Sequence, residues 1–441
     1  MMKPCLFSVG SRLQNRNTFL LLLAAGGLLR AQTVPAQYTG PGSCSSSSCH
    51  GGVQPRKETS VLQNEYSTWV VQDKHTRAFA AMTGDVGRRM GRILNLDTQK
   101  SSRCLTCHAI DVDQSQKASS FDRNDGVGCE NCHGPSSNWL GPHTTRGWNY
   151  EKSLGLGMYD TRDLIKRSEK CLSCHLGSGE KYVDHEMIAA GHPDLYFEQA
   201  SFESVMPRHW AEPKENDPTI EVKTMVVGQA VQLRENLLRI SRNTTKFWPE
   251  YAELDCFSCH HSLVAAKDSW RQERGYEGRR AGNPPWNPSR YAIFQLVAGE
   301  IDRSSAQQLD SEVKKVLALV SDIAADKTQI AKAAASAAEV ADAVAKRMSA
   351  AQIDTARTNR LLKVIAADSE RIAWQGERTA EQATMAIDTL FIASSRANGK
   401  TGNDGPVRAA INGLFQLLQN PSAYNPQTFA RQMKNVEALL P

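Results

Sequence analysis

The sequence predicts a mainly α-helical chain in two parts, and three observations lead to this prediction. All five cysteine pairs beyond residue 36 lie before residue 296, among Gly/Pro loops and short helical patterns. From Ile301 onward there is neither cysteine nor histidine. Residues 331–351 contain eleven alanines in twenty-one positions, which favours a long helix. We therefore expect a first part with little regular strand, followed by an antiparallel helical bundle.

Besides the alanine-rich helix over 331–351, the bundle is expected to contain three further helical stretches. Apolar residues recur at helical spacing from Val313 to Val320. Residues 361–396 read as one further helix, which ends before the loop NGKTGNDGP, and a last helix is expected over 407–419. Packing and oligomer formation are the simplest roles for this part, and a docking surface for a partner enzyme is the alternative.

The N-terminal segment has the order of a secretory signal peptide. Lys3, Arg12 and Arg16 precede the apolar run TFLLLLAAGGLL, and small residues follow at 34–36. We expect cleavage near residue 36 and a mature chain in the periplasm or another exported location; an uncleaved anchor is the alternative. Removal of residues 1–36 takes away four positive charges, so the formal net charge falls from +5 to +1. We expect no transmembrane segment in the mature chain and no nucleic-acid partner.

Four of the cysteine pairs have the pattern C-x-x-C-H, which is the attachment signature of c-type haem. Two thiols reach the two vinyl groups of one porphyrin, and the next side chain presents an imidazole to the iron. Zinc sites and disulfides do not require a histidine directly after every pair. We therefore predict covalent haem c at these motifs, through Cys104, Cys107 and His108; Cys129, Cys132 and His133; Cys171, Cys174 and His175; and Cys256, Cys259 and His260.

The remaining pair has the wider pattern CSSSSCH, with Cys44, Cys49 and His50. Two extra small residues can bulge from the loop while both thiols still reach the porphyrin. We interpret it as another haem site, so that five haem c groups are expected; a Cys44–Cys49 disulfide is the alternative. In chain order we call these sites the first (His50), second (His108), third (His133), fourth (His175) and fifth (His260).

Six further histidines are available as second axial ligands for the five irons. Imidazole on both sides gives a six-coordinate iron that transfers electrons, whereas an open side lets the iron bind a small molecule. The weakest candidate is His261, because it directly follows His260. The five stronger candidates are His75, His143, His185, His192 and His209.

The first part of the chain resembles the cytochrome c-554 family of multihaem electron carriers. The similarity lies in WVVQDKHTRAFAAM, GVGCENCHGPSSNWLGPH and EKCLSCHL, and in the order of the first four motifs. The resemblance implies that His143 is the second ligand of the first site and His75 that of the fourth. It places the second ligand of the third site after the fourth motif, at His185, His192 or His209.

The resemblance also implies that the second site, on His108, has no distal histidine, although the histidines after His175 can close it. Two functions follow from these alternatives. The first is an exported electron carrier whose partner is another cytochrome, a quinol-linked complex or an oxidoreductase. The second is a multihaem reductase or oxidoreductase that acts on a small nitrogen or sulfur compound at an open second site. The expected division is a signal peptide over 1–36, a haem part over 37–295 and a helical part over 296–441.

Overall fold

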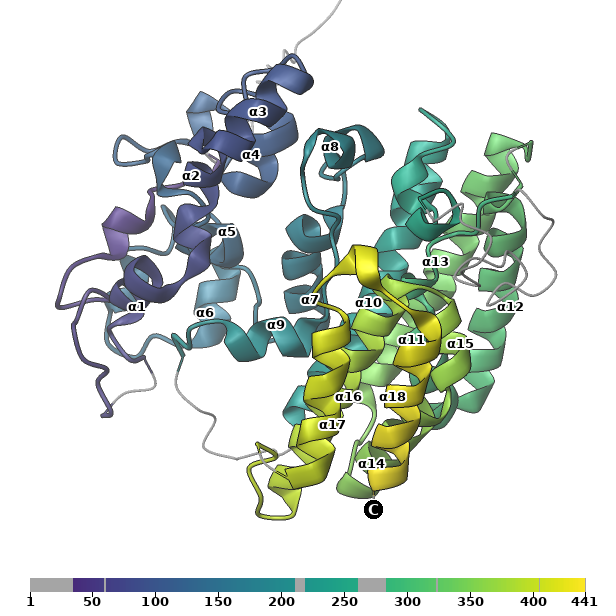
Figure 1. Ribbon diagram of the computed structural model, residues 1–441. Coiled ribbons are helices and arrows are strands. Elements are labelled where there is room, and N and C mark those ends of the chain that lie inside the picture. The colour runs from purple at the N-terminus through teal and green to yellow at the C-terminus, as the bar shows by residue number, and fades with distance from the viewer. Residues whose placement is uncertain are drawn as a thin grey trace, which may run out of the picture. The chain divides into compact units, whose positions relative to one another are not determined.

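The chain is built from helices, short turns and loops (Figure 1). The computed structural model describes residues 35–58, 61–210, 219–260, 283–322, 324–403 and 405–440. Extended pairing in these ranges is limited to the bridges Tyr38–Lys117 and Leu254–Trp286, which confirms the prediction of a mainly helical chain. Within the same ranges, no helix is long and apolar enough to cross a membrane. Almost all of the expected signal peptide, and His261, lie outside the described residues.

The segment with the first four motifs consists of short helices. Three of its cysteine motifs are themselves helical: α4 ends at His108, α5 spans the whole third motif, and the fourth motif runs from α7 into the single π-turn Ser173–Gly177. The helices are α1 (Glu65–Gln72), α2 (Ala78–Thr83), α3 (Asp85–Ile93), α4 (Ser102–His108), α5 (Cys129–His133), α6 (Tyr150–Gly155), α7 (Leu164–Leu172), α8 (His185–Ala190) and α9 (Gln199–Val205).

Longer helices follow, and aspartates cap several of them. The side chains of Asp302, Asp326 and Asp354 each accept a hydrogen bond from a backbone N–H in the first turn, as N-cap residues do. These helices are α10 (Ile220–Thr244), α11 (Ala292–Ile301), α12 (Arg303–Val320), α13 (Lys327–Ala350), α14 (Thr355–Ala367), α15 (Ser369–Trp374), α16 (Glu377–Ala397), α17 (Gly405–Leu417) and α18 (Pro426–Leu439).

The expectation of one continuous helix over 361–396 is wrong, because the chain breaks there into α14, α15 and α16. Gly376 is the N-cap of α16 and has a φ of 95°, a left-handed conformation that favours glycine and cannot continue a helix. The helix expected over 407–419 corresponds to α17, and α18 follows it as a helix that was not expected.

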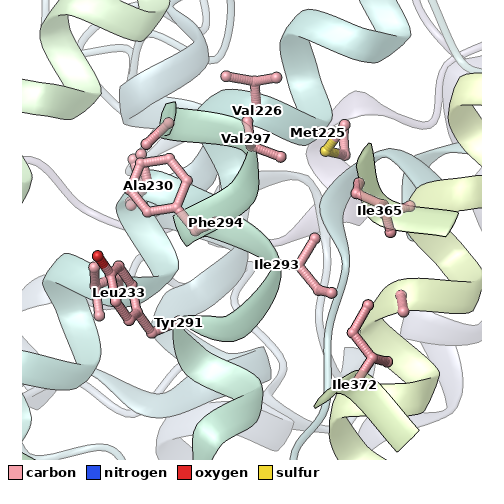
Figure 2. Close-up of a cluster of buried hydrophobic side chains, with 14 of the residues drawn as sticks. Met225, Val226, Ala230, Leu233, Tyr291, Ile293, Phe294, Val297, Ile365 and Ile372 are labelled. Carbon is pink, nitrogen blue, oxygen red and sulfur yellow. The ribbon is translucent and has the colours of Figure 1, made fainter. Parts of the chain in front are cut away.

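The hydrophobic core is organised around α10. Its side chains Val226 and Leu233 are fully buried and belong to the same cluster as Phe294 and Val297 of α11 (Figure 2). Helix α13 packs against α10. One cluster of buried hydrophobic residues extends from helix α7 before the fourth motif to Val436 in α18. The core therefore continues across residue 296, and the structure from Ala36 onward forms one unit.

Candidate haem sites

In four pairs of histidines, the distance between the ring centres is the one expected when both rings bind one metal ion. A metal–imidazole bond is about 2 Å long and the ring centre lies about 1 Å beyond the nitrogen, so two imidazoles on opposite sides of one metal have ring centres about 6 Å apart. In each pair, one histidine follows a cysteine pair and the other does not. The ring centres are 6.1 Å apart for His50 and His143, 6.0 Å for His75 and His175, 6.3 Å for His108 and His192, and 6.2 Å for His185 and His260.

At the third motif, three nearby charges act on His133, and that of His209 comes before those of His50 and Lys170. Burial lowers the pKa of His133 to about 4, and the nearby charge of His209 adds to this effect. Burial likewise lowers the pKa of His175 to about 4. Both imidazoles are therefore neutral at neutral pH, which is the form that binds a metal.

The distal histidines are thus distributed differently from what the resemblance implies for the second site. The ring centre of His192 lies 6.3 Å from that of His108, so a second histidine lies near the second motif, where the resemblance implies none. Of the three candidates for the third site, His209 is the one whose charge acts on His133. His185 lies opposite His260, for which the resemblance offers no partner. The positions of His75 and His143 agree with the implied pairing.

At the first four sites, at least one histidine has its Nδ1 atom within hydrogen-bond distance of an oxygen acceptor. Metal-binding histidines typically donate this second N–H to a carboxylate or carbonyl oxygen, which orients the ring and leaves the Nε2 lone pair for the metal. The Nδ1 distances are 2.9 Å from His50 to Glu65 Oε2, 2.8 Å from His75 to Asp73 Oδ1, 2.8 Å from His108 to the Ala78 carbonyl, 3.0 Å from His143 to the Trp139 carbonyl, 2.7 Å from His192 to the Pro193 carbonyl and 3.3 Å from His209 to the Pro207 carbonyl.

Two of these acceptors are carboxylates that sequence reasoning missed. Asp73 is buried, with 7% of its side chain exposed. Burial opposes its ionisation, but the hydrogen bonds from His75 outweigh this and hold the pKa of Asp73 below its usual range. Glu65 behaves in the same way beside His50. The sequence could have indicated Asp73, because this aspartate stands two residues before the candidate ligand His75. It also caps the turn that carries His75.

All ten cysteines from Cys44 onward are free thiols, so the Cys44–Cys49 disulfide is absent from the structure. The serine loop closes on itself through hydrogen bonds from the Cys49 and Gly51 N–H groups to the Ser46 carbonyl, at 2.9 Å each. His50 donates its N–H to the Cys44 carbonyl at 3.3 Å. The residues between the two cysteines therefore form a closed turn, and the backbone of His50 is held next to that of Cys44.

The thiols of different motifs also meet. Cys44 of the first motif interacts with Cys129 of the third, and Cys107 of the second interacts with Cys174 of the fourth. Cys132 of the third motif lies within electrostatic reach of Cys174. The first four motifs are therefore close neighbours, in the spatial order first, third, fourth and second.

A buried carboxylate fixes the third motif. Glu130, with 2% of its area exposed, lies between the two cysteines of the third motif. It accepts hydrogen bonds from the N–H groups of Thr39, Gly40 and Ser136 at 2.7–3.0 Å. Glu130 therefore connects the third motif to the segment that leads into the first motif.

A buried ion pair fixes the approach to the fifth motif. The guanidinium of Arg239 in α10 donates to both carboxylate oxygens of Glu253 and also to the Leu176 carbonyl. Leu176 directly follows His175, and Glu253 lies three residues before Cys256. The helical core thus positions the fourth and fifth motifs relative to each other.

The donor sets of the first, second, fourth and fifth sites fit a c-type haem, because covalent attachment and six-fold coordination need two thiols and two imidazoles. The hydrophobic cluster around the second motif is also small: its buried members are Met82, Cys104, Leu105 and Ala109. Short helices that bury so little apolar surface need a disulfide, a metal or another bound group for stability. Both observations fit a porphyrin at this site.

Comparison with known proteins agrees with this donor set. Residues 44–134 match the family described as cytochrome c554 and c-prime. Cytochrome c-554 of Nitrosomonas europaea is 30% identical over 172 residues, which cover 36% of this chain and 64% of that protein. No solved structure matches the chain. The family implies c-type haem in the matched region.

Proposed function

We propose, from the premise that the chain carries a cytochrome c554 and c-prime family domain, that it is an exported five-haem c-type cytochrome that carries electrons between redox partners. The observation that carries this proposal is the pairing of histidine rings 6.0–6.3 Å apart at four of the five sites. When bound, each haem supplies a one-electron iron couple. Two imidazoles per iron would keep the coordination the same in both oxidation states. The reorganisation energy of electron transfer would therefore be small.

The neighbouring thiols support a continuous row of sites. A thiol that bonds to a porphyrin lies at the edge of that porphyrin, so thiols in contact bring two porphyrin edges together. The contacts of Cys44 with Cys129 and of Cys107 with Cys174 join the first site to the third and the second to the fourth. The electrostatic interaction of Cys132 with Cys174 joins the third site to the fourth site.

The alternative function, reduction or oxidation of a small compound, requires an iron with an open side. The second site was the candidate, and His192 lies on that side of His108. At each of the other sites within the described residues, a second histidine lies near the motif histidine. The arrangement therefore favours electron transfer over catalysis.

The expected partners are redox proteins, such as another cytochrome, a quinol-linked complex or an oxidoreductase. Location outside the cytoplasm follows from the signal peptide expected over 1–36 and from the oxidising, export-linked route by which haem c is attached. The formal charge of +1 after cleavage does not include the haem propionates. Because each haem adds two carboxylates, the loaded protein is more acidic than its sequence, which favours a partner with a basic surface.

Haem stoichiometry and spin state test the proposal together. The pyridine haemochrome assay on the purified exported protein should give five haems per chain. Electron paramagnetic resonance of the oxidised protein should show low-spin iron, and carbon monoxide should leave the reduced spectrum unchanged. The matched control is the double variant Cys44→Ser with Cys49→Ser, which should give four haems. A count of four in the unmodified protein would remove the first site, and a high-spin haem that binds carbon monoxide would favour the catalytic alternative.

A further inference from the structure

One short helix presents histidines to two different sites. His185 is the first residue of α8, and its ring centre lies 6.2 Å from that of His260 at the fifth site. His192 lies two residues beyond the end of α8, and its ring centre lies 6.3 Å from that of His108 at the second site. At helical rise, seven residues correspond to roughly 10 Å. The second ligands of these two sites therefore come from points close together on one rigid element.

The two ends of α8 direct His185 and His192 towards different motif histidines. At the start, Asp184 caps the helix by accepting the Met187 N–H at 2.8 Å. At the end, Gly191 adopts a φ of 116°, which turns the chain out of the helix. The His192 N–H still bonds to the Met187 carbonyl at 3.0 Å, so the turn is fixed. His192 therefore leaves α8 in a defined direction different from that of His185.

Side chains from the neighbourhood of both motifs hold α8 in place. Arg103, directly before Cys104 of the second motif, donates to Asp184 Oδ2 at 2.7 Å and to Glu186 Oε2 at 3.0 Å. Glu250, six residues before Cys256 of the fifth motif, accepts the His185 N–H at 3.0 Å. The helix is thus anchored to the segments that carry both motifs.

We propose that α8 bridges the second and fifth haem sites, supplies the distal imidazole of each, and makes the second site an internal member of the row. The inference rests on the proposed function, because it needs haem at both motifs. It places the fifth site beyond the second, as one end of the row. The two thiols of the fifth motif, Cys256 and Cys259, are both exposed, whereas Cys104 of the second motif is buried. The fifth site is therefore the end suited to meet a redox partner.

The test uses a magnetic probe placed at the second site of the full-length protein with its haems. The variant His192→Ala opens that site. Reduction with dithionite under carbon monoxide, followed by reoxidation with ferricyanide, leaves ferrous iron with carbon monoxide at the opened site and ferric iron at the others. Because the trapped ferrous iron is diamagnetic, it no longer broadens the paramagnetic resonance signal of a neighbouring ferric site. The signal of the fifth site is identified as the low-spin signal that is lost in His185→Ala.

We expect the fifth-site signal of His192→Ala to sharpen and to saturate at lower microwave power after trapping, while the first-site signal stays unchanged. The matched control is His143→Ala, which opens the first site; trapping there should leave the fifth-site signal unaltered. A fifth-site signal unaffected by trapping at the second site would overturn the proposal. If His192→Ala does not load its haems, stepwise reduction of the unmodified protein gives the same comparison, because the fifth-site signal must change when the second site is reduced. Five low-spin haems without this coupling would refute the bridge and leave the proposed function standing.

Discussion

The charge of Asp73 offers a direct test of the fourth site. Its Oδ1 atom lies 2.8 Å from His75 Nδ1, the imidazole ring spans about 2 Å more, and the metal–nitrogen bond adds about 2 Å, so the carboxylate lies about 7 Å from the iron. One unit charge at that distance, at an effective dielectric constant near 20, contributes about 2 kcal/mol. For a one-electron couple this corresponds to about 100 mV.

We therefore predict that Asp73→Asn raises the midpoint potential of the fourth site by about 100 mV, because loss of the negative charge favours the reduced iron. The amide oxygen still accepts the hydrogen bond from His75, so the site stays low-spin. Redox titration followed by electron paramagnetic resonance measures the shift. The control is Asp85→Asn on α3, since that carboxylate is 97% exposed and therefore screened by solvent. A fourth-site potential that moves no further than in the control would refute the assignment of His75 as its ligand.

Three other substitutions test the supporting structure. Arg103→Gln removes the ion pairs to α8, and we expect slow carbon monoxide binding to appear at the reduced second site; stopped-flow spectra would show it. Arg239→Met leaves the carboxylate of Glu253 buried without its partner, which should destabilise the protein by about 3–5 kcal/mol in denaturant titration; equal stability of variant and unmodified protein would contradict this. Hydrogen bonds from Ser305 lower the pKa of Asp302 to about 2, below its usual value near 4. Its contribution to stability is therefore present above pH 4 and lost as the pH falls to about 2, so melting temperatures of Asp302→Asn and the unmodified protein should converge over that interval.

The proposed haem motifs could be recognised in the sequence because haem attachment is a local requirement. Two thiols and an imidazole must reach one porphyrin, and only close spacing along the chain achieves this. The wide first motif follows the same requirement, since its loop is closed by hydrogen bonds among its own residues. The candidate second ligands could also be chosen from sequence, because the five sites proposed here need imidazoles from elsewhere in the chain.

The pairing of histidines at the second and fifth sites was not predictable from sequence, because it depends on tertiary contacts. His192 is 84 residues from His108, and nothing local to either residue indicates that they meet. The resemblance reaches only to about the fourth motif, so it gave no partner for the fifth site. The acceptors Ala78 and Trp139 are backbone carbonyls, which carry no residue-specific signal at all.

The helical character of the C-terminal part was predictable. The points where its helices break, and the packing of α10 against them, were not. The pattern over 361–396 is helical throughout, and only the left-handed conformation at Gly376 shows where α16 begins. Likewise, α10 lies before the fifth motif in sequence, yet its buried face joins the core of the C-terminal helices. A sequence boundary drawn at the change in composition separates segments that pack together.

The position of α10 also bears on what the C-terminal helices do. Arg239, buried in that core, bonds to Leu176 after the fourth motif and to Glu253 before the fifth. A core that only served oligomer formation would not need a buried cation aimed at these two segments, since burial of a charge is costly unless it is paired. Because rigid spacing between sites controls how fast electrons pass, a packed helical core beside the fourth and fifth motifs has a direct use in electron transfer. If the proposed row of haem sites is correct, we expect the helical core to fix the spacing between the fourth and fifth sites, because Arg239 in that core bonds beside both motifs.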